Sequence, residues 1–341
     1  MPFSQYLGQL PDNITRVSAR EVMHRVLTDT SVSDADLSAL LTALAARTIT
    51  ANELAGFADA MRALSIPLPF TDAERSTLVD TCGTGGDDSG TFNISTAAAL
   101  VAAAAGAKIA KHGNRSITSR CGSADVLEAL GVPVALSPDQ SVACLRATGF
   151  AFLYAPALHP ALKRVQPIRR ALGFRTVFNV LGPLTNPAHA AAQVMGVYAR
   201  DLVPVAAAAM ALLGVRRALV VHGADGVDEL TLHGPSEIAE VASGTVTGRS
   251  ISAADAALPA APLKALTGGD AVDNAHILRS IFSGEKGPRR DTVVFNAAAA
   301  LFVAGLASDL REGVEKSAHA IDTGKATQTV AALNDFAASI R

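Results

Sequence analysis

Residues 77–116 read TLVDTCGTGGDDSGTFNISTAAALVAAAAGAKIAKHGNRS. They begin with a short apolar run at 77–80, which predicts a β-strand, and continue through a glycine-rich turn. An alanine-rich segment at 94–105 predicts a buried helix, and the apolar run at 107–110 predicts the next strand. The order strand, helix, strand is a βαβ unit, whose two strands lie parallel. This stretch therefore predicts an α/β fold built on a parallel sheet.

The region between Asp88 and Asp125 contains no carboxylate, although the whole chain is nearly balanced, with a net charge of −2. The cations in this region are Lys108, Lys111, Arg115 and Arg120. The region is also rich in Gly, Ser, Thr and Asn. Backbone N–H groups, hydroxyls and positive charges together are typical of a site for phosphate or pyrophosphate.

The turn Gly83-Thr84-Gly85-Gly86 stands where a strand gives way to a helix, which is where open α/β sheets bind ligands. It matches neither common phosphate fingerprint, since it lacks both Gly-Lys-Ser/Thr and GxGxxG. For this turn alone, a tight turn that needs positive φ is the alternative interpretation. The polar segment 111–119 follows the next predicted strand. Two neighbouring strand ends directed at one place favour an anion site.

Two carboxylates, Asp228 and Glu229, follow a further predicted strand at 218–222. A solvated acidic loop is the simplest interpretation of such a pair. Hard cations such as Mg²⁺, however, prefer oxygen ligands and often bridge carboxylates to the phosphates of a substrate. An acidic pair at a strand end, opposite a phosphate site without carboxylates, fits that arrangement.

Several basic residues lie outside this pattern. His112 on its own fits a hydrogen-bonded structural histidine or a metal ligand, and the sequence favours neither. Arg169 and Arg170 precede the segment Gly173-Phe174-Arg175-Thr176. These arginines are either surface charges or a forked clamp on a carboxylate or phosphate.

Composition excludes some classes of protein. The 341 residues are 49% apolar and 18% charged, which suits a large core in one larger and one smaller domain, or in two comparable domains. A net charge of −2 argues against a general binder of nucleic acid or of membrane surfaces. The longest apolar runs are shorter than a membrane span needs. The three cysteines are widely spaced and odd in number, so we expect no disulfide framework and a cytoplasmic location.

The first 65 residues have a helical pattern. Ser18-Ala19-Arg20-Glu21 and Thr50-Ala51-Asn52-Glu53 each have the form of a capping box. Leucines at 37, 40, 41 and 44 mark one face of a helix between them. The segment Ile66-Pro67-Leu68-Pro69 then breaks the pattern. We expect a helical domain at 1–72 and an α/β domain at 73–341.

From about residue 76 onward, the sequence pattern alternates between predicted strands and predicted helices. Ser137 and Pro138 predict the start of a helix, and Gly149 predicts its end. Further strands are expected at 151–154 and 193–198, in addition to the strand at 218–222. Long helices close the chain.

Taken together, these motifs resemble the anthranilate phosphoribosyltransferase family. The match runs collinearly from about residue 18 to the C-terminus, and the set of motifs is highly specific. The motifs are Asp80-Thr81-Cys82-Gly83-Thr84-Gly85-Gly86-Asp87, Thr91-Phe92-Asn93-Ile94-Ser95-Thr96, Lys111-His112-Gly113-Asn114-Arg115-Ser116, Gly122-Ser123-Ala124-Asp125, Arg175-Thr176-Val177-Phe178-Asn179-Val180-Leu181-Gly182-Pro183-Leu184, His222-Gly223 with Asp228-Glu229, and Gly284-Glu285-Lys286-Gly287-Pro288.

The resemblance implies a small N-terminal helical domain, completed by helices from about 163–190. It implies a larger α/β domain with a mostly parallel central sheet flanked by helices, as in nucleoside phosphorylases and phosphoribosyltransferases. The active site would lie between the two. The implied reaction transfers a 5-phosphoribosyl group from phosphoribosyl pyrophosphate to the amine of anthranilate in tryptophan biosynthesis. Mg²⁺ is the implied cofactor, and a homodimer the implied assembly.

The resemblance also assigns site residues. Phosphoribosyl pyrophosphate would be held by Gly83, Gly86, Asp87, Thr91, Asn93, Ile94, Ser95, Thr96, Lys111, His112, Gly113, Asn114, Arg115, Ser116, Ser119 and Ser123. Anthranilate would be held by Gly83, Asn114, Arg169, His159 and Pro183. Mg²⁺ would be ligated by Ser95, Asp228 and Glu229. His112 is the candidate general base.

The chain departs from the family at one point, where Arg120-Cys121 replaces the more usual Lys-Ser, so that Cys121 takes the place of a hydroxyl. Two other classes of protein are alternatives to this family. A pyrimidine nucleoside phosphorylase would carry Lys-His-Ser-Thr-Gly-Gly in the second phosphate loop, and this chain does not. A nucleic-acid-binding relative would show a basic excess and would lack the Asp-Glu pair, and neither trait is present.

Overall fold

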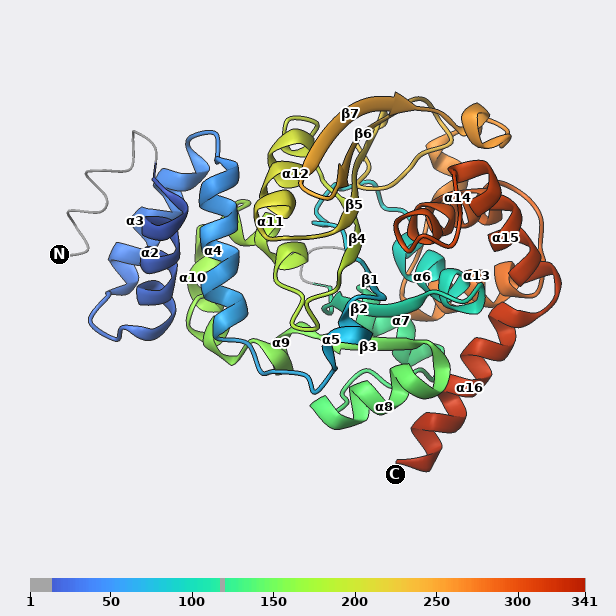
Figure 1. The fold of residues 1–341 in the computed structure, drawn as a ribbon, viewed down its shortest axis with the longest axis horizontal. Helices are drawn as coiled ribbons and strands as arrows, with labels where there is room; N and C mark the ends of the chain where they lie inside the picture. The colour runs from blue at the N-terminus through green and yellow to red at the C-terminus, as the bar shows by residue number, and fades with distance from the viewer. Residues whose placement is uncertain (1–13, 117–119, 341) are drawn as a thin grey trace.

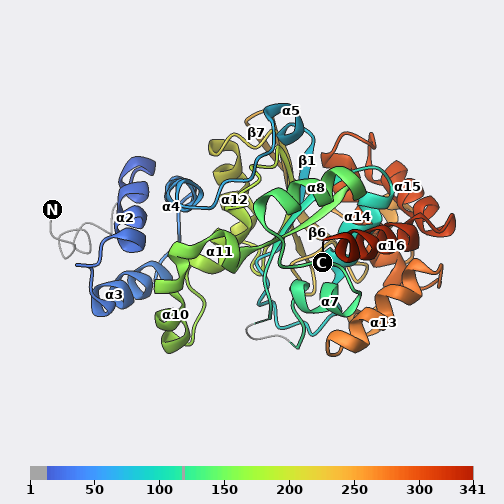
Figure 2. The same ribbon diagram turned by 90° about the horizontal axis from the view of Figure 1, so that it is seen from below.

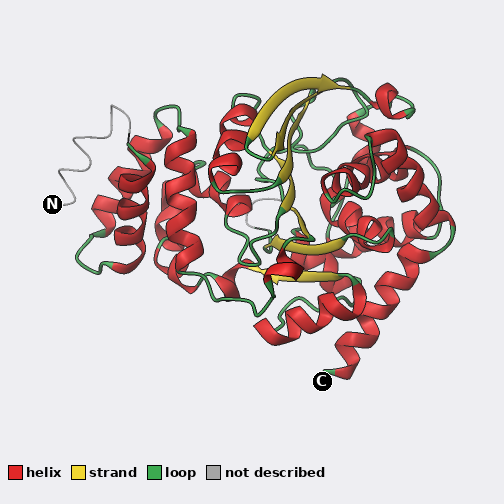
Figure 3. Ribbon diagram, viewed as in Figure 1, coloured by secondary structure: helices red, strands yellow, loops and turns green. Residues whose placement is uncertain are grey.

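The structure is a computed structural model, and it describes residues 14–116 and 120–340. It consists of a small group of N-terminal helices beside a larger body in which helices surround a sheet (Figure 1). Figure 3 shows the strands crossing the middle of the larger body, with helices on both sides. This is the predicted fold class.

The N-terminal helices are α2 (Arg16–Thr28), α3 (Asp34–Ala45) and α4 (Ala51–Ala63). Thr50 caps α4 in a capping box, as predicted. The capping box predicted at Ser18 is wrong, because α2 begins at Arg16 and Thr15 accepts the hydrogen bond from the Ser18 N–H. Thr15 offers the same hydroxyl as Ser18, one turn closer to the chain end, so the helix extends to it.

The remaining helices follow along the larger body. They are α5 (Asp72–Arg75), α6 (Ile94–Ala104), α7 (Ser123–Ala129), α8 (Pro138–Thr148), α9 (Ala155–Leu158), the 3₁₀ helix η1 (Pro160–Arg164), α10 (Gln166–Leu172), α11 (Val177–Leu184), α12 (Leu202–Leu212), the 3₁₀ helices η2 (Ala253–Ala256) and η3 (Leu263–Leu266), α13 (Ala271–Phe282), α14 (Pro288–Val303), α15 (Leu310–Asp322) and α16 (Lys325–Ser339). Ser137 caps α8 and Gly149 ends it in a left-handed conformation, as predicted. No helix within the described ranges is long and apolar enough to cross a membrane.

One sheet has the strand order β3-β2-β1-β4-β5-β6-β7. The strands are β1 (Leu78–Thr81), β2 (Lys108–Gly113), β3 (Phe150–Tyr154), β4 (Ala192–Gly196), β5 (Arg217–Gly223), β6 (Ser236–Ala242) and β7 (Thr245–Ile251). β1 to β5 are parallel, whereas β6 and β7 pair antiparallel at one edge. The parallel strands place the loops after β1, β2, β4 and β5 at one edge of the sheet, which is where a ligand site is expected.

The two faces of the sheet belong to different cores. Leu219 and Val221 of β5 pack in a core with α6 and α14, while Ala218 and Val220, on the opposite face, pack with α12. This alternation follows from the two-residue period of a strand. The second core also contains Leu37 and the other buried residues of the N-terminal helices.

The helices between β3 and β4 lie against the N-terminal group. α10 contacts α3, and α11 contacts both α3 and α4. Figure 2 shows α10 and α11 between the N-terminal helices and the sheet. The division of the chain at residue 72 stays a prediction, since the core of the N-terminal helices continues through α12 onto one face of the sheet.

Candidate active site

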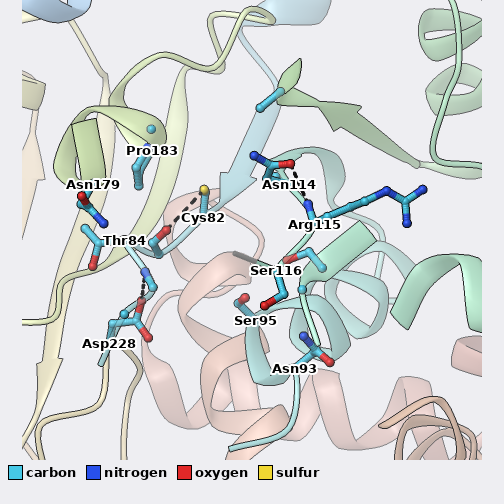
Figure 4. Close-up of a pocket in the computed structure, with 18 of the residues that line it drawn as sticks. Cys82, Thr84, Asn93, Ser95, Asn114, Arg115, Ser116, Asn179, Pro183 and Asp228 are labelled. Carbon is cyan, nitrogen blue, oxygen red and sulfur yellow. Dashed lines mark hydrogen bonds between the residues drawn. The ribbon is translucent and has the colours of Figure 1, made fainter. Parts of the chain in front are cut away.

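A cavity of about 640 Å³ opens at the carboxyl ends of the parallel strands. Loops after β1, β2 and β5 line one side of it, and α4, α9, η1, α10 and α11 line the other. In Figure 4, Asn179 and Pro183 of α11 lie on one side of this space, and Asn93, Ser95 and Asn114 lie across from them. The cavity is thus built jointly by the helical group and the sheet.

The glycine-rich turn after β1 forms one wall. Gly85 has a φ of +62°, which a residue with a side chain rarely adopts. Its N–H donates a hydrogen bond of 2.7 Å to Oδ2 of Asp228 (Figure 4). A Cβ atom added at Gly83 would collide with the same carboxylate. Glycine is therefore required here for both conformation and close approach.

The two carboxylates after β5 lie beside this turn. Asp228 contacts Gly85, and Oε1 of Glu229 accepts a hydrogen bond of 3.1 Å from the N–H of Ser95 at the start of α6. Asp87 approaches from the other side, and its Oδ2 accepts from the N–H of Asp228 at 3.4 Å. The predicted acidic loop therefore borders the cavity, next to the predicted anion turn.

Crowding of these carboxylates changes their acidity. Burial, with a further contribution from the charge of Asp87, raises the pKa of Asp228 to about 7. Burial and the charge of Asp228 raise the pKa of Glu229 well above its usual value. Like charges held together in a poorly solvated place disfavour ionisation. A divalent cation would remove this repulsion.

The oxygen ligands beside the glycine-rich turn fit Mg²⁺. They are hard oxygen ligands, namely the carboxylates of Asp228 and Glu229 and the hydroxyl of Ser95. The mutual repulsion that raises the carboxylate pKa values is what a cation compensates. Within residues 14–116 and 120–340, no cluster of three or more His, Cys, Asp or Glu side chains forms a complete metal site. Mg²⁺ is usually held by one or two carboxylates, with waters and substrate phosphates completing its coordination.

Lys111 of β2 is a buried cation close to these carboxylates. Its side chain is buried, and Nζ donates to the carbonyl of Thr81 and, at 3.3 Å, to Oγ of Ser95. Its charge also favours the ionised forms of Asp80 and Glu229. Burial nevertheless raises the pKa of Asp80 to about 6. The ammonium group thus offsets part of the negative charge at the base of the cavity.

Two histidines form the opposite part of the cavity. His112 and His159 are both buried, with ring centroids 5.1 Å apart in an edge-to-face arrangement. Burial lowers the pKa of His112 to about 3 and that of His159 to about 4. Nδ1 of His112 lies 3.1 Å from the carbonyl of Gly182 and must donate to it, so the neutral ring carries its lone pair on Nε2. Nε2 has no hydrogen-bond partner among the described residues.

Arg169 lies on α10 and faces the same part of the cavity. Its guanidinium lies 5.4 Å from the ring centroid of Phe178, and burial lowers its pKa. No carboxylate in the described part of the chain pairs with it, in contrast to Arg16, Arg115 and other arginines that do form ion pairs. A partly desolvated guanidinium that lines a cavity without an acidic partner is suited to an anionic ligand.

Arg115 was predicted to hold phosphate, but its side chain forms ion pairs with two carboxylates of α7. Its guanidinium pairs with Asp125 at 3.0 Å and with Glu128 at 2.5 Å. Figure 4 shows the side chain directed away from Ser95 and Asp228. Its backbone N–H donates to the side chain of Asn114 at 2.7 Å. The arginine therefore holds the loop after β2 in place against α7.

Most predicted site residues line this one cavity. Those predicted to bind phosphoribosyl pyrophosphate are Gly83, Gly86, Asp87, Thr91, Asn93, Ile94, Ser95, Lys111, His112, Gly113, Asn114, Arg115, Ser116 and Ser123. Those on the acceptor and metal side are Arg169, His159, Pro183, Asp228 and Glu229. Thr96 is a buried residue of α6 and is not part of the lining, and Ser119 lies outside the described residues. The individual roles of these residues stay predictions.

Sequence reasoning missed several residues of the lining. They include Met61, Leu162, Lys163, Phe178, Asn179 and Asn274. Asn274 is buried, and its amide donates to Oδ1 of Asn93 at 2.9 Å while accepting from the N–H of Gly269 at 2.8 Å. The paired glycines 268 and 269 before α13 were a usable signal, because they allow the chain to approach Phe92 closely.

Comparison with known proteins agrees with this geometry. The model of the α/β domain of a glycosyl transferase family matches residues 75–327, and the model of its helical bundle domain matches residues 8–65. An anthranilate phosphoribosyltransferase from Solibacter usitatus is 50% identical over 96% of both chains. One from Haloferax volcanii is 48% identical over 95% of this chain and 96% of its own.

Solved structures show the same similarity. The anthranilate phosphoribosyltransferase of Thermus thermophilus superposes with a TM-score of 0.91 and 40% identity, over 99% of both chains. The enzyme of Saccharomyces cerevisiae in complex with PRPP and Mg superposes with a TM-score of 0.88 and 28% identity, over 99% of this chain and 98% of its own. The chain belongs to this glycosyl transferase family, and within it to the anthranilate phosphoribosyltransferases.

Proposed function

We infer that the protein transfers the 5-phosphoribosyl group of phosphoribosyl pyrophosphate to the amine of anthranilate, giving N-(5-phosphoribosyl)anthranilate and pyrophosphate. This is a step of tryptophan biosynthesis. One observation carries the inference: a single cavity has a buried carboxylate pair beside a glycine turn at one end and Arg169 near two neutral histidines at the other. The first end suits a magnesium pyrophosphate, and the second suits a small aromatic carboxylate.

The donor end is organised by the loops after β1, β2 and β5. In the yeast relative, PRPP and Mg occupy the protein together. We propose that Asp228 and Glu229, with the hydroxyl of Ser95, hold Mg²⁺ against the pyrophosphate, and that the cavity-facing backbone of 83–87 cradles it. Mg²⁺ would supply charge neutralisation for the leaving pyrophosphate. No strong general acid is then needed, because that leaving group is already an anion.

The acceptor end is organised by α9, α10 and α11. We propose that the guanidinium of Arg169 pairs with the carboxylate of anthranilate, and that Asn114, His159, Gly83 and Pro183 enclose the ring. Yeast relatives have been solved with 4-fluoroanthranilate, which carries the same two functional groups. Positioning of a weak aromatic amine should supply much of the rate, because it converts a bimolecular encounter into a local one.

His112 is the candidate general base, and its environment refines that role. With a pKa near 3 it is neutral at physiological pH and a weak proton acceptor. We propose that His112 lines the acceptor end beside His159 as such a weak base, and that its neutral ring leaves the amine of anthranilate uncharged and nucleophilic.

The proposal can be tested by genetic complementation. A bacterial strain that lacks this step should grow without tryptophan when it expresses the protein. The matched control is the near-isosteric double variant Asp228→Asn with Glu229→Gln, which keeps the hydrogen bonds to Gly85 and Ser95 but removes the ligand charges. Growth with the wild type and not with the double variant supports the proposal. Failure of a well-expressed, folded wild type to restore growth would contradict it.

We further propose that the protein acts as a homodimer in the cytoplasm. Val17 on α2 and Leu212 on α12 are exposed apolar side chains, with 67% and 42% of their surfaces accessible. The helix ends that carry them are joined by a hydrogen bond of 2.6 Å from the Arg16 side chain to the carbonyl of Leu212. Exposed apolar side chains are suited to association with a second copy. The three free cysteines fit a reducing compartment.

A further inference from the structure

Arg175 lies in the short segment between α10 and α11, and it joins the two ends of the cavity. The helices on either side of it carry Arg169 and Pro183, which belong to the acceptor end. The side chain of Arg175 crosses to the donor end, where Nη2 donates to the carbonyl of Gly86 and, at 3.0 Å, to Oδ2 of Asp88. One side chain therefore links the acceptor helices to the glycine-rich turn.

The guanidinium is held from a second side as well. It lies 4.7 Å from the ring centroid of Tyr198, which follows β4. Tyr198 is itself tied to the turn, since its N–H donates to Oγ1 of Thr84 at 3.0 Å. Arg175, Tyr198 and the turn thus form a closed set of contacts, in which a planar guanidinium stacks on a ring and donates at its edge.

The turn needs external support. Gly85 and Gly86 have positive φ, and Asp88 also has a φ of +56°, a conformation that residues with a side chain adopt at some cost. Another of its contacts, from the N–H of Gly85 to Asp228, uses a carboxylate that the proposed metal also needs. The Arg175 contact with Gly86 does not compete with the metal in this way.

The ion pair with Asp88 is the weakest part of this arrangement. The Asp88 side chain is 80% exposed and that of Arg175 is 44% exposed. Exposed ion pairs contribute little to stability. The hydrogen bond to the Gly86 carbonyl and the stacking on Tyr198 therefore provide most of the support that Arg175 gives to the turn.

We propose that Arg175 is a positioning residue for the donor site: it fixes the glycine-rich turn for pyrophosphate and ties that turn to the helices that hold the acceptor. This proposal rests on the proposed function and adds a residue to it. It predicts that loss of Arg175 weakens the donor while the acceptor is affected little. It also predicts that the turn loosens before any ligand is bound.

The test compares Arg175→Ala with Arg170→Ala, an exposed arginine of the same stretch. In Arg175→Ala, the KM for phosphoribosyl pyrophosphate should rise about tenfold, because a charge-assisted hydrogen bond is lost. The KM for anthranilate should stay within about threefold. Arg170→Ala should match the wild type. Arg175→Lys should lie between them, because an ammonium keeps the charge but loses the stacked plane.

Hydrogen exchange of the ligand-free proteins separates positioning from direct contact with phosphate. Backbone amides of 83–90 should exchange faster in Arg175→Ala than in the wild type or Arg170→Ala. Unchanged exchange together with weakened donor binding would make Arg175 a phosphate ligand and overturn the proposal, as would an unchanged KM for the donor. The exchange comparison needs no activity, so it remains decisive even where the proposed reaction itself fails in the wild type.

Discussion

At the scale of single residues, we predict that recognition of the acceptor depends on Arg169. It is half-buried, without a carboxylate partner among the described residues, and packed on Phe178. Arg169→Ala should raise the KM for anthranilate about tenfold or more, because a charge-assisted hydrogen bond contributes about 1.5–3 kcal/mol. The KM for phosphoribosyl pyrophosphate should stay within about threefold, as expected for weakly coupled sites.

Steady-state kinetics with each substrate varied in turn would measure both constants. Arg169→Lys should rescue only part of the loss, because it keeps the charge but lacks the fork that pairs with a carboxylate. If Arg169→Ala weakened the donor and spared anthranilate, the arginine would be a phosphate ligand and the two ends of the cavity would be assigned the wrong way round.

Gly85 is the residue that tests the anion turn. Open space surrounds the position of its missing Cβ, so a larger side chain would fit, but a φ of +62° is unfavourable for a β-branched residue. Gly85→Val should therefore distort the turn rather than the core. We expect binding of phosphoribosyl pyrophosphate to disappear in calorimetry while the Tm falls by only a few degrees, about 1–2 kcal/mol of local strain. Retained binding would show that the phosphates lie elsewhere.

The sequence predicted the residues whose chemistry is local, and it missed those that depend on folding. Gly85 and Lys111 stand out by type and position along the chain. Phe178 and Asn274 are ordinary residues whose relevance comes from what they contact after folding. The ion pair of Arg115 with Glu128, thirteen positions away in sequence, could not be predicted either. An arginine that is free to bind a ligand and one that is already paired look identical in a sequence.

At the scale of secondary-structure elements, we predict that the loop after β5 couples proton release to metal binding. Burial raises the pKa of Asp228 to about 7, so below that pH the group is largely protonated and a cation must displace the proton. Affinity for the metal should therefore increase with pH by up to about tenfold per unit below 7 and level off above it.

Binding of Mn²⁺, which shares the oxygen preference of Mg²⁺, can be followed by electron paramagnetic resonance without substrate. Asp228→Asn should bind Mn²⁺ more weakly and with a shallower dependence on pH, because Glu229, whose pKa burial also raises, is then the one remaining carboxylate of the pair. The same steep dependence in that variant would assign the titrating group to another residue. An affinity that decreased as pH rose would contradict the proposed ligands altogether.

Helices and strands with a clear sequence pattern were predicted close to their observed bounds. A hairpin that depends on pairing between strands was not predicted. The predicted strand at 218–222 is β5, and the predicted helix at 94–105 is α6. The hairpin of β6 and β7 was not predicted, although its turn at Ser243 and Gly244 has positive φ at both residues. β7 is almost wholly exposed, so its residues lack the apolar alternation by which a strand is recognised.

At the scale of the whole molecule, the exposed side chains of Val17 and Leu212 lead us to predict association with a second copy of the chain. Val17→Asp should shift the protein from dimer to monomer in size-exclusion chromatography with light scattering, since a buried unpaired charge opposes association. Val272→Asp is the matched control, because Val272 is also exposed, at 72%, but lies on α13 far along the chain from the helical group. A wild type that is monomeric at high concentration would contradict the dimer.

The most direct test of the central claim is the stoichiometry of the reaction. Anthranilate fluorescence, pyrophosphate release and product mass should be measured together, with purified protein, phosphoribosyl pyrophosphate and Mg²⁺. We predict that anthranilate disappears and pyrophosphate appears in equal amounts, that the product has the mass of N-(5-phosphoribosyl)anthranilate, and that chelation of the metal stops all three changes. Pyrophosphate release without loss of anthranilate, or no turnover by the folded protein, would contradict this account.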